Sequence, residues 1–375
     1  MEERDIALNF IYLSKNHAGG KDQVGLNLLK GFQEIGFTSH LYVICYDYST
    51  EVVKRIAPGV EIIAIKSLNS TNEIIRLSQL CLFNTFRLNR IIDEYGIKLV
   101  YHLSCNTGIS KLHAKSVVIP HDIKTVAHRV LANVKIPFYK YIIYKVMYDI
   151  DFRTNDGIIA ISDTDKSEIS EFYPKYKDKV TRIYDPIDIV PDTGIRKRDG
   201  NYICALNLQF HHKNIITLIK AFELIKGEVS QNLVLIGNVP KRVKYLKEYV
   251  SEHNLSDRVT FTGFVSDEER NRLFKNCDLY VNPTLYEGFG MTAVEALIQR
   301  IPTLVSKIPT NYEITMGLAW YYEPAEDAEE LAKAIKTALM TDWEDAESKS
   351  RIIYDRYNYL TIANEHKVYF ESWIQ

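Results

Sequence analysis

NPTLYEGFGMTAVEA, residues 282–296, is the stretch from which the fold of this chain can be read. It continues a short apolar segment, Asp278 to Asn282, which has the length and composition of a buried strand. It leads into Met291 to Gln299, where apolar residues recur on one side of a helix. The stretch therefore predicts a strand, a glycine-containing turn and a helix in succession, which is the repeating unit of a parallel α/β sheet.

The turn carries Gly288, Phe289 and Gly290, and the helix begins with Met291 and Thr292. Because a glycine has no Cβ, the backbone at Gly288 and Gly290 can take positive φ angles and let a ligand come close. The first N–H groups of a helix lack partners within the helix and attract phosphate or sugar hydroxyl groups. The turn is therefore a candidate binding site built from backbone.

Two carboxylates flank this turn. Glu287 stands just before the helix and can accept hydrogen bonds from sugar hydroxyls, while Glu295, about two turns further along, can reach back to the hydroxyls of a ribose. The alternative is that Gly-Phe-Gly is an ordinary turn and Glu295 an exposed helix charge, since short motifs often match by chance.

The run from Pro283 to Ala296 resembles the signature of retaining glycosyltransferases of the glycosyltransferase 4 family, also called glycosyl transferases group 1. In that family two glutamates separated by seven residues are embedded in a Pro-Ser/Thr-x-x-Glu-Gly-Phe-Gly segment. The resemblance implies that Glu287 acts at the transferred sugar and that Glu295 binds the ribose. It implies that the remaining donor contacts in this run are made by Gly288, Phe289, Gly290, Met291 and Thr292.

The resemblance also implies an α/β fold of the GT-B type. In this fold two Rossmann-like domains with mostly parallel sheets face an interdomain cleft, and a C-terminal helix crosses back to the first domain. The domains expected are an acceptor-binding domain over residues 1–190 and a nucleotide-sugar-binding domain over residues 200–355. Residues 356–375 are expected to form the helix that packs back on the first domain.

The composition is that of a soluble globular chain with enough material for two cores: 375 residues, of which 46% are hydrophobic and 25% charged. A formal net charge of −2 argues against a nucleic-acid partner, which requires a concentrated positive field. The start, Met1 to Asp5, is too polar for a secretory signal, and no run approaches the ~18 apolar residues of a membrane span. We therefore expect a cytoplasmic protein.

Strand and helix patterns alternate along the first half, which indicates a mostly parallel sheet covered on both faces. Strands are expected at residues 6–13, 39–46, 60–65, 98–103 and 116–119, with one long helix from about Asn72 to Tyr95. The first strand is followed by Gly19 and Gly20, a pair that resembles the first loop of the family, which lies over the donor phosphates or the acceptor.

A later apolar strand delivers His121 at its carboxyl end, where open α/β sheets bind ligands. A lone histidine is often structural, but the His121-Asp122 pair resembles the family's histidine near the transferred sugar. As a hydrogen-bond partner this histidine needs no metal.

From Ile187 to Asn201 prolines, glycines and a charged run interrupt the periodicity, which indicates a hinge. The alternation then restarts with a strand at 202–206. Lys213 falls between that strand and the next helix, which puts its ammonium near the helix N-terminus and suits a diphosphate. It resembles the family's lysine at this position.

Two positions depart from the family pattern. Asn207 and Leu208 occupy the region where the family often has a phosphate-binding arginine, and Arg300 stands where it commonly has glycine. Metal ions are the other way to neutralise a diphosphate, usually through Asp-x-Asp pairs. The pairs Asp149/Asp151 and Asp163/Asp165 have this spacing, but the first lies in a tyrosine-rich segment and the second at a helix start, so we expect no metal.

Residues 135–148 combine tyrosines and lysines with apolar residues. Such a segment can lie on an anionic membrane surface. The alternative is an ordinary amphipathic helix, within Lys124 to Arg153, whose lysines are solvated.

These features predict a retaining, metal-independent glycosyltransferase that uses a UDP- or GDP-linked sugar as co-substrate and no cofactor. By family analogy its acceptor is a glycan or lipid-linked sugar of the bacterial cell envelope. Two alternatives remain: a sugar-nucleotide 2-epimerase, which shares the two-domain plan, and a catalytically inactive partner subunit of a glycosyltransferase.

Overall fold

The computed structural model describes residues 4–17, 19–67, 73–131, 133–191 and 200–374, and these form two compact units. The first unit consists of residues 1–129, 136–188 and 357–375, and the second of residues 130–135 and 189–356. Most of the predicted hinge, including Gly194 and the charged run 196–199, lies outside the described residues.

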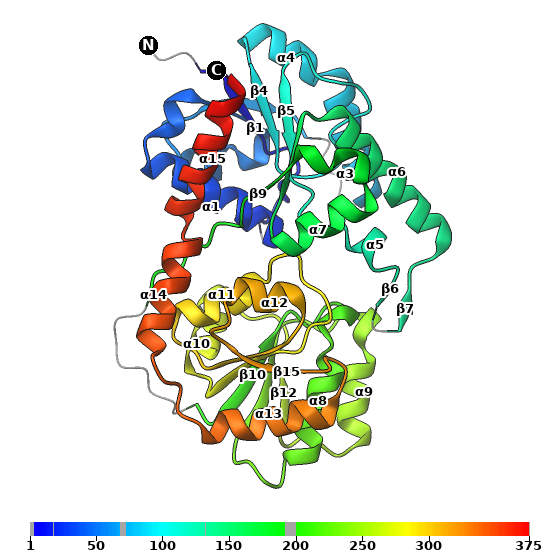
Figure 1. Ribbon diagram of the computed structural model, residues 1–375, viewed down its shortest axis with the longest axis vertical. Helices are drawn as coiled ribbons and strands as arrows, with labels where there is room; N and C mark the ends of the chain where they lie inside the picture. The colour runs from blue at the N-terminus through cyan, green and yellow to red at the C-terminus, as the bar shows by residue number, and fades with distance from the viewer. Residues whose placement is uncertain (1–3, 18, 68–72, 132, 192–199, 375) are drawn as a thin grey trace. The chain divides into compact units, whose positions relative to one another are not determined.

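The first unit is built on a seven-stranded parallel sheet with the order β3-β2-β1-β4-β5-β8-β9. Its strands are rich in apolar residues and mostly buried, as expected of a parallel sheet covered on both faces (Figure 1). The strands are β1 (Ile6–Asn9), β2 (Leu41–Tyr46), β3 (Glu61–Ile65), β4 (Leu99–His102), β5 (Lys115–Val118), β8 (Gly157–Ala160) and β9 (Val180–Arg182).

Helices cover this sheet and complete the first unit. They are α1 (Gly20–Glu34), α2 (Thr50–Ile56), α3 (Glu73–Phe86), α4 (Leu88–Tyr95), α5 (Lys124–Ala127), α6 (Phe138–Thr154), α7 (Asp163–Phe172) and α15 (Tyr359–Ile374). Short 3₁₀ helices lie at Phe37–His40, Asp47–Ser49 and Pro174–Lys179.

The last helix, α15, packs against α1 within the first unit (Figure 1). Gly31 permits this contact, because a Cβ at that position would stand 2.5 Å from the carbonyl oxygen of Tyr359 and 2.6 Å from the Cβ of Ala363. Ile187 also pairs with Asn358, so the segments that leave and re-enter the unit are hydrogen-bonded to each other. Glycine at position 31 therefore allows α15, near the end of the chain, to pack closely against α1, near its beginning.

The second unit contains a six-stranded parallel sheet with the order β12-β11-β10-β13-β14-β15. Its strands are β10 (Tyr202–Leu206), β11 (Asn232–Ile236), β12 (Val259–Phe261), β13 (Leu279–Asn282), β14 (Thr303–Ser306) and β15 (Trp320–Tyr322). Its helices are α8 (Ile215–Ile225), α9 (Tyr245–Glu252), α10 (Asp267–Asn276), α11 (Met291–Ile298), α12 (Pro309–Ile314), α13 (Ala328–Met340) and α14 (Ala346–Tyr357). Two 3₁₀ helices precede α8 and α9, at His211–Lys213 and Lys241–Val243.

The predicted α/β class with two parallel sheets is confirmed, and so is the apolar side of the helix that follows the glycine turn, since Val294, Leu297 and Ile298 are buried. Some expected elements were wrong. The long helix to Tyr95 is broken at Arg87 into α3 and α4, and its expected start at Asn72 lies outside the described residues. The first strand ends at Asn9, four residues earlier than expected.

The segment expected as one amphipathic helix from Lys124 to Arg153 contains two helices and a hairpin. The single turn α5 is followed by the antiparallel pair β6 (Val130–Leu131) and β7 (Val134–Lys135), and only then by α6. Asn133 takes the left-handed conformation that this tight turn requires, with φ of 59°. Residues 130–135 group with the second unit, whereas α6 belongs to the first.

Both sheets have a topological switch point, where successive connections leave in opposite directions along the sheet. It lies between β1 and β4 in the first unit and between β10 and β13 in the second. Ligands of open α/β sheets bind outside the carboxyl ends of the strands at such points. Among the described helices, none has the length and apolar character of a membrane span.

Candidate functional site

The glycine turn and Lys213 meet at the switch point of the second sheet. Lys213 lies in the loop after β10, and Glu287 to Gly290 lie in the loop after the neighbouring strand β13. The two loops are joined through their backbones, because the N–H of Leu285 donates to the carbonyl oxygen of His212 at 2.8 Å. Residues 74 positions apart are therefore held beside each other.

The loop after β13 is held by hydroxyl groups from three directions. The hydroxyl of Thr284 lies 2.8 Å from the carbonyl oxygen of Tyr286 and 3.1 Å from that of His212. The hydroxyl of Ser306 donates to the carbonyl oxygen of Thr284, and that of Thr310 donates to the carbonyl oxygen of Glu287 at 3.0 Å. The backbone around Glu287 is thus fixed before any ligand binds.

Lys213 and Glu287 form an ion pair. The Nζ of Lys213 lies 2.6 Å from Oε1 of Glu287, and the two side chains are 14% and 10% exposed. A lysine ammonium has three N–H donors, so two remain for another anion, and the second carboxylate oxygen of Glu287 can still accept. The pair can therefore face a ligand that has both phosphate oxygens and hydroxyl groups.

Gly290 is the N-cap residue of α11 and takes the left-handed conformation, with φ of 88°. A Cβ at this position would be strained and would stand 3.2 Å from Cδ1 of Ile314. Gly288, Met291 and Thr292 are half-buried beside it, while Phe289 is buried and anchors the turn. The hydroxyl of Thr292 accepts a hydrogen bond from Tyr280 at 2.8 Å.

Glu295 lies on α11 and pairs with Arg270 of α10, whose Nη2 is 3.2 Å from Oε2. Burial raises the pKa of Glu295, and Arg270 opposes that shift through its charge and its hydrogen bond. Arg270 was not singled out in the sequence. Only the fold brings it to Glu295, because the two residues lie on different helices and 25 positions apart.

Two further groups near the turn were missed from the sequence. The amide nitrogen of Asn282, at the end of β13, and the amide oxygen of Asn311, on α12, are buried without a hydrogen-bond partner. The oxygen of Asn311 would stand 3.7 Å from a Cβ at Gly290, so it lies directly beside the glycine turn. Buried polar atoms without partners are unusual and can mark ligand contacts.

The positions that depart from the family pattern have local explanations. Asn207 takes φ of 64° and Leu208 is completely buried, so this part of the loop forms a tight turn. A different cation reaches the same loop: Nε of Arg242 donates to the carbonyl oxygen of Gln209 at 2.6 Å, and its guanidinium lies over the ring of Phe210. Arg300 takes φ of 60°, a conformation that glycine adopts more readily.

His121 follows β5 in the first unit and is buried. Its Nε2 donates to the carbonyl oxygen of Leu103 at 2.8 Å, since a carbonyl can only accept. Burial lowers the pKa of His121 to about 3, with Lys21 contributing in the same direction. The imidazole is therefore neutral at physiological pH, and Nδ1 is its hydrogen-bond acceptor.

Gly19 and Gly20 lie at the start of α1, after β1 of the same sheet. Gly19 is extended and takes the N-cap position, and a Cβ on Gly20 would meet nothing within 4 Å. Nearby, Asp22 is buried and accepts hydrogen bonds from the backbone and hydroxyl of Ser14. The pair thus leaves open space above the first turn of α1.

The Asp-x-Asp pairs have structural partners. Asp151 accepts hydrogen bonds from the backbones of Asn106 and Thr107, and Asp165 accepts one from the backbone of Ile161. Within the described part of the chain, no group of three histidine, cysteine or acidic side chains could hold a metal ion. These carboxylates therefore serve to fix loops of the first unit.

The structure brings Lys213, Glu287 and the glycine turn together, and it places Glu295 in the same unit, on the helix α11 that follows the turn. His121, Gly19 and Gly20 belong to the first unit and lie at the carboxyl edge of its sheet. The second unit thus offers cations, carboxylates and helix N–H groups at one edge, which suits a ligand with both phosphates and hydroxyls.

Comparison with known proteins agrees with this chemistry. Residues 191–358 match the model of the family "Glycosyl transferases group 1". The chain is 24% identical over 351 residues to O-antigen chain mannosyltransferase RfbU of Salmonella typhimurium, an alignment that covers 91% of this chain and 92% of RfbU.

Two solved structures share the fold of the whole chain. Sucrose-phosphate synthase from Thermosynechococcus elongatus superimposes with a TM-score of 0.77 at 18% identity and covers 99% of each chain. HepE of Anabaena, in complex with UDP and glucose, gives a TM-score of 0.69 at 17% identity over 99% of this chain and 100% of HepE. The predicted GT-B fold is thereby confirmed.

Proposed function

We propose that this chain is a member of the glycosyl transferases group 1, whose family model its residues 191–358 match, and that it catalyses the following reaction. It transfers a hexose from a UDP- or GDP-linked donor to a glycan or lipid-linked acceptor, with retention at the anomeric carbon and without a metal ion. The single observation that carries this proposal is the Lys213–Glu287 pair beside the glycine turn at the switch point of the second sheet.

In this proposal the second unit binds the donor. The two remaining donors of the Lys213 ammonium and the first N–H groups of α11 stabilise the charge that develops on the leaving diphosphate. Glu295 accepts hydrogen bonds from the ribose hydroxyls, and Glu287 accepts them from the transferred sugar. This division is supported by geometry, because Glu287 contacts Lys213 directly whereas Glu295 contacts Arg270.

Retention is proposed to arise because the acceptor hydroxyl attacks the face from which the diphosphate leaves. A leaving phosphate oxygen then accepts the hydroxyl proton. His121, neutral and with Nδ1 as an acceptor, is suited to hold a sugar hydroxyl rather than to carry charge. A covalent intermediate on Glu287 is the alternative route to retention, and trapping of a glycosylated Glu287 by mass spectrometry would establish it instead.

The acceptor class proposed is bacterial cell-envelope polysaccharide. Its support is the likeness over most of both chains to an O-antigen chain mannosyltransferase. The transferases and synthases found by comparison give no support to the epimerase alternative. Lys213, Glu287 and Glu295 are all present and paired, which also speaks against an inactive subunit.

The experiment that tests the reaction is a thermal-shift screen of UDP-, GDP- and ADP-linked sugars, followed by transfer assays with the donor that binds. We expect one nucleotide class to raise the unfolding temperature and its sugar to be transferred with the donor's anomeric configuration, as read by NMR. Transfer should persist in EDTA. Failure of every nucleotide sugar to bind would contradict the proposal, and inversion would contradict the mechanism alone.

We also propose that α6 lies on an anionic membrane surface. Its N-terminal half exposes large apolar side chains next to Lys140 and Lys145, at Phe138, Tyr139, Ile142, Ile143, Tyr144 and Val146. An amphipathic helix of this kind binds through its apolar face, and each nearby lysine adds about 1 kcal/mol at an anionic surface.

Vesicle co-sedimentation tests this contact. The wild type should bind vesicles that contain phosphatidylglycerol and bind phosphatidylcholine vesicles less. Ile143→Asp should abolish the binding, whereas Leu224→Asp, an equally exposed leucine on α8 of the second unit, should not change it. Equal binding by the two variants would favour the ordinary amphipathic helix.

A further inference from the structure

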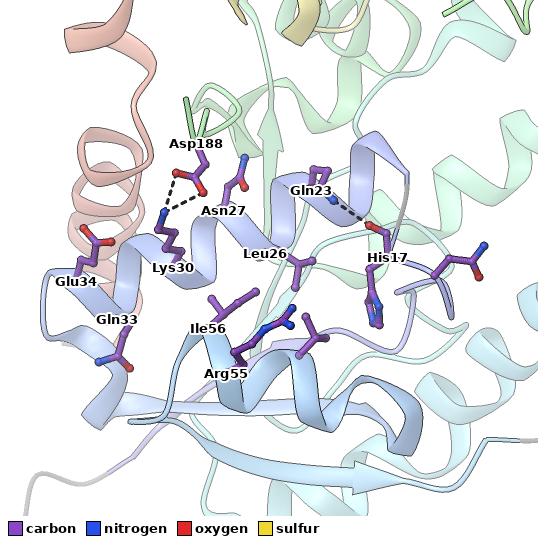
Figure 2. Close-up of a pocket in the computed structure, with 12 residues that line it drawn as sticks. His17, Gln23, Leu26, Asn27, Lys30, Gln33, Glu34, Arg55, Ile56 and Asp188 are labelled. Atoms are coloured by element: carbon purple, nitrogen blue, oxygen red, sulfur yellow. Dashed lines mark hydrogen bonds and ion pairs between the residues drawn. The ribbon is translucent and has the colours of Figure 1, made fainter. Parts of the chain in front are cut away.

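A groove of about 670 Å³ runs along α1 of the first unit (Figure 2). One wall is a face of α1 that carries Gln23, Leu26, Asn27, Lys30, Gln33 and Glu34. Val52, Arg55 and Ile56 of α2 form the opposite wall. Its volume lies in the range of small-molecule sites, and the face from Gln23 to Glu34 is about 16 Å long. The groove is therefore elongated.

The lining is polar but carries no net charge. Lys30 is paired with Asp188 at 2.8 Å, and the remaining charged groups, Arg55 and Glu34, have opposite signs. Burial lowers the pKa of His17 at one end of the groove, with Asp22 opposing that shift and Arg55 adding to it, so this imidazole does not bring a strong positive charge. A polyanion needs an excess of positive charge, so this groove does not suit one.

Amide side chains dominate the remaining lining, and several have unused hydrogen-bonding atoms. Gln23 donates to the carbonyl oxygen of His17 and Asn27 to that of Pro186, which leaves both amide oxygens as acceptors. Gln33 accepts from the backbone of Gly59, which leaves its NH₂ group as a donor. The groove thus offers both acceptors and a donor, and each hydroxyl of a sugar can use both.

Apolar side chains also line the groove: Leu26 on the α1 wall, and Val52 and Ile56 on the α2 wall. A pyranose ring likewise combines apolar and polar groups, with C–H groups on its faces and hydroxyl groups around its edge. The match is therefore with a neutral saccharide in preference to a peptide or a charged cofactor.

The position of the groove in the fold indicates how a bound chain of sugars would be oriented. One end is formed by Asn16 and His17, in the loop after β1 that continues to Gly19 and Gly20. That loop lies at the carboxyl end of β1, next to the switch point of the first sheet. The other end lies at Gln33 and Glu34, at the far end of α1. A chain of sugars in the groove would thus point one end toward the edge where His121 lies.

We infer that this groove binds the neutral oligosaccharide part of the acceptor, namely the sugars that precede the one receiving the new residue. That the bound oligosaccharide is an acceptor rests on the proposed function, but its binding does not require a nucleotide-sugar donor. The two can therefore fail separately.

The test is binding of linear neutral oligosaccharides without nucleotide, by saturation-transfer NMR and calorimetry. The probes are manno-, gluco- and N-acetylgluco-oligosaccharides from mono- to pentasaccharides. We expect at least one series to bind more tightly as its length increases. The double variant Asn16→Ala/Arg55→Ala should lose about tenfold in affinity for the longer members and nothing for the monosaccharide.

The matched control is Lys54→Ala, which removes a neighbouring positive charge of α2 that does not line the groove. It should bind as the wild type does. Asn16 and Arg55 are exposed, so the double variant should keep the wild-type unfolding temperature and its response to UDP or GDP. That response shows that the donor side is intact.

Three results would overturn the inference: no neutral oligosaccharide binds, the double variant binds all lengths like the wild type, or uronic-acid oligosaccharides bind more tightly than neutral ones of equal length. If oligosaccharides bind as expected but no nucleotide sugar does, the groove stands and the proposed transfer reaction falls. If nucleotide sugars bind and oligosaccharides do not, the inference about the groove falls and the donor binding of the proposed function stands.

Discussion

The two units share the strand order around their switch points but carry side chains of different charge there. In the second unit the strands β10 and β13 are followed by Lys213 and Glu287, which form an ion pair at 2.6 Å. In the first unit the equivalent strands β1 and β4 end in Asn9 and His102, joined by a hydrogen bond of 3.1 Å between neutral groups. Burial lowers the pKa of His102 to about 3.

This difference indicates what each unit is suited to bind. A paired lysine and glutamate, with the first turn of a helix beside them, can exchange part of their mutual attraction for that of a charged ligand. Neutral imidazole and amide groups can hold hydroxyls without favouring an anion. We therefore propose that the second unit recognises phosphate as well as hydroxyl groups, whereas the first recognises hydroxyl groups alone. Each of the following predictions tests this contrast.

The largest effect is expected from Lys213→Ala. Loss of the ammonium removes the cation from the leaving group and leaves the partly buried Glu287 without its partner. We expect kcat/KM to fall about 10- to 100-fold, on the order of 1–3 kcal/mol of transition-state stabilisation.

Glu287→Ala and the double variant complete a double-mutant cycle with Lys213→Ala. Because the two side chains contact each other, their effects on kcat/KM should not add. Lys220→Ala, an exposed lysine on α8 of the same unit, is the control and should leave kcat/KM unchanged. Additive effects would mean that the pair does not act as one group.

The sequence was sufficient to predict the two parallel sheets and the strand, turn and helix around residues 282–296. Apolar strands buried on both faces and glycines at strand ends are local signals, and α11 with its buried Val294 and Leu297 follows from them. Local signals did not predict every helix boundary. Nothing in the sequence around Arg87 announces the break between α3 and α4, since neither glycine nor proline stands there.

Pairing between elements could not be predicted in the same way. The sequence indicated Glu295 as a binding residue, but its partner Arg270 comes from α10 and is placed by the packing of two helices. The unpartnered amide nitrogen of Asn282 and amide oxygen of Asn311 likewise become visible only when their buried surroundings are known. The groove along α1 depends on how α2 lies beside it, which no periodicity in either helix specifies.

The next effect in size concerns Glu295 and Arg270. Glu295→Gln should weaken UDP or GDP binding about tenfold, since an amide is a poorer acceptor than a carboxylate. Arg270→Ala should act through Glu295 and show it by pH dependence. Burial already raises the pKa of Glu295, and removal of Arg270 raises it further, so the variant's carboxyl takes up a proton at a higher pH.

Calorimetry at mildly acidic and mildly alkaline pH measures this prediction. Nucleotide binding by Arg270→Ala should approach the wild-type value at the alkaline end and weaken toward acid, where the wild type still binds. The double variant Arg270→Ala/Glu295→Gln should show no such pH dependence. A pH-independent loss in Arg270→Ala alone would mean that the arginine contacts the ligand itself.

A smaller effect is expected for Gly290→Ala. The φ of 88° puts an alanine in the left-handed region, and its Cβ would come within 3.2 Å of Ile314. We expect a loss of about 1–2 kcal/mol in the free energy of unfolding, measured by urea denaturation. Gly227→Ala is the control, because a Cβ there meets nothing within 4 Å and its φ is not positive; it should not lower the stability.

The smallest effect is expected for His121, whose imidazole should not titrate near neutral pH. An ordinary histidine loses its proton near pH 6.5, but the pKa of His121 is lowered to about 3, so its imidazole is already neutral in the range around neutral pH. The profile of kcat/KM should therefore show no inflection from His121 between about pH 5 and 8. His121→Gln, which keeps an acceptor and a donor, should lower kcat/KM by less than about tenfold and leave the shape of the profile unchanged. An inflection near pH 6.5 that disappears in His121→Gln would show that the first unit also uses a charged group, and would remove the contrast between the two units.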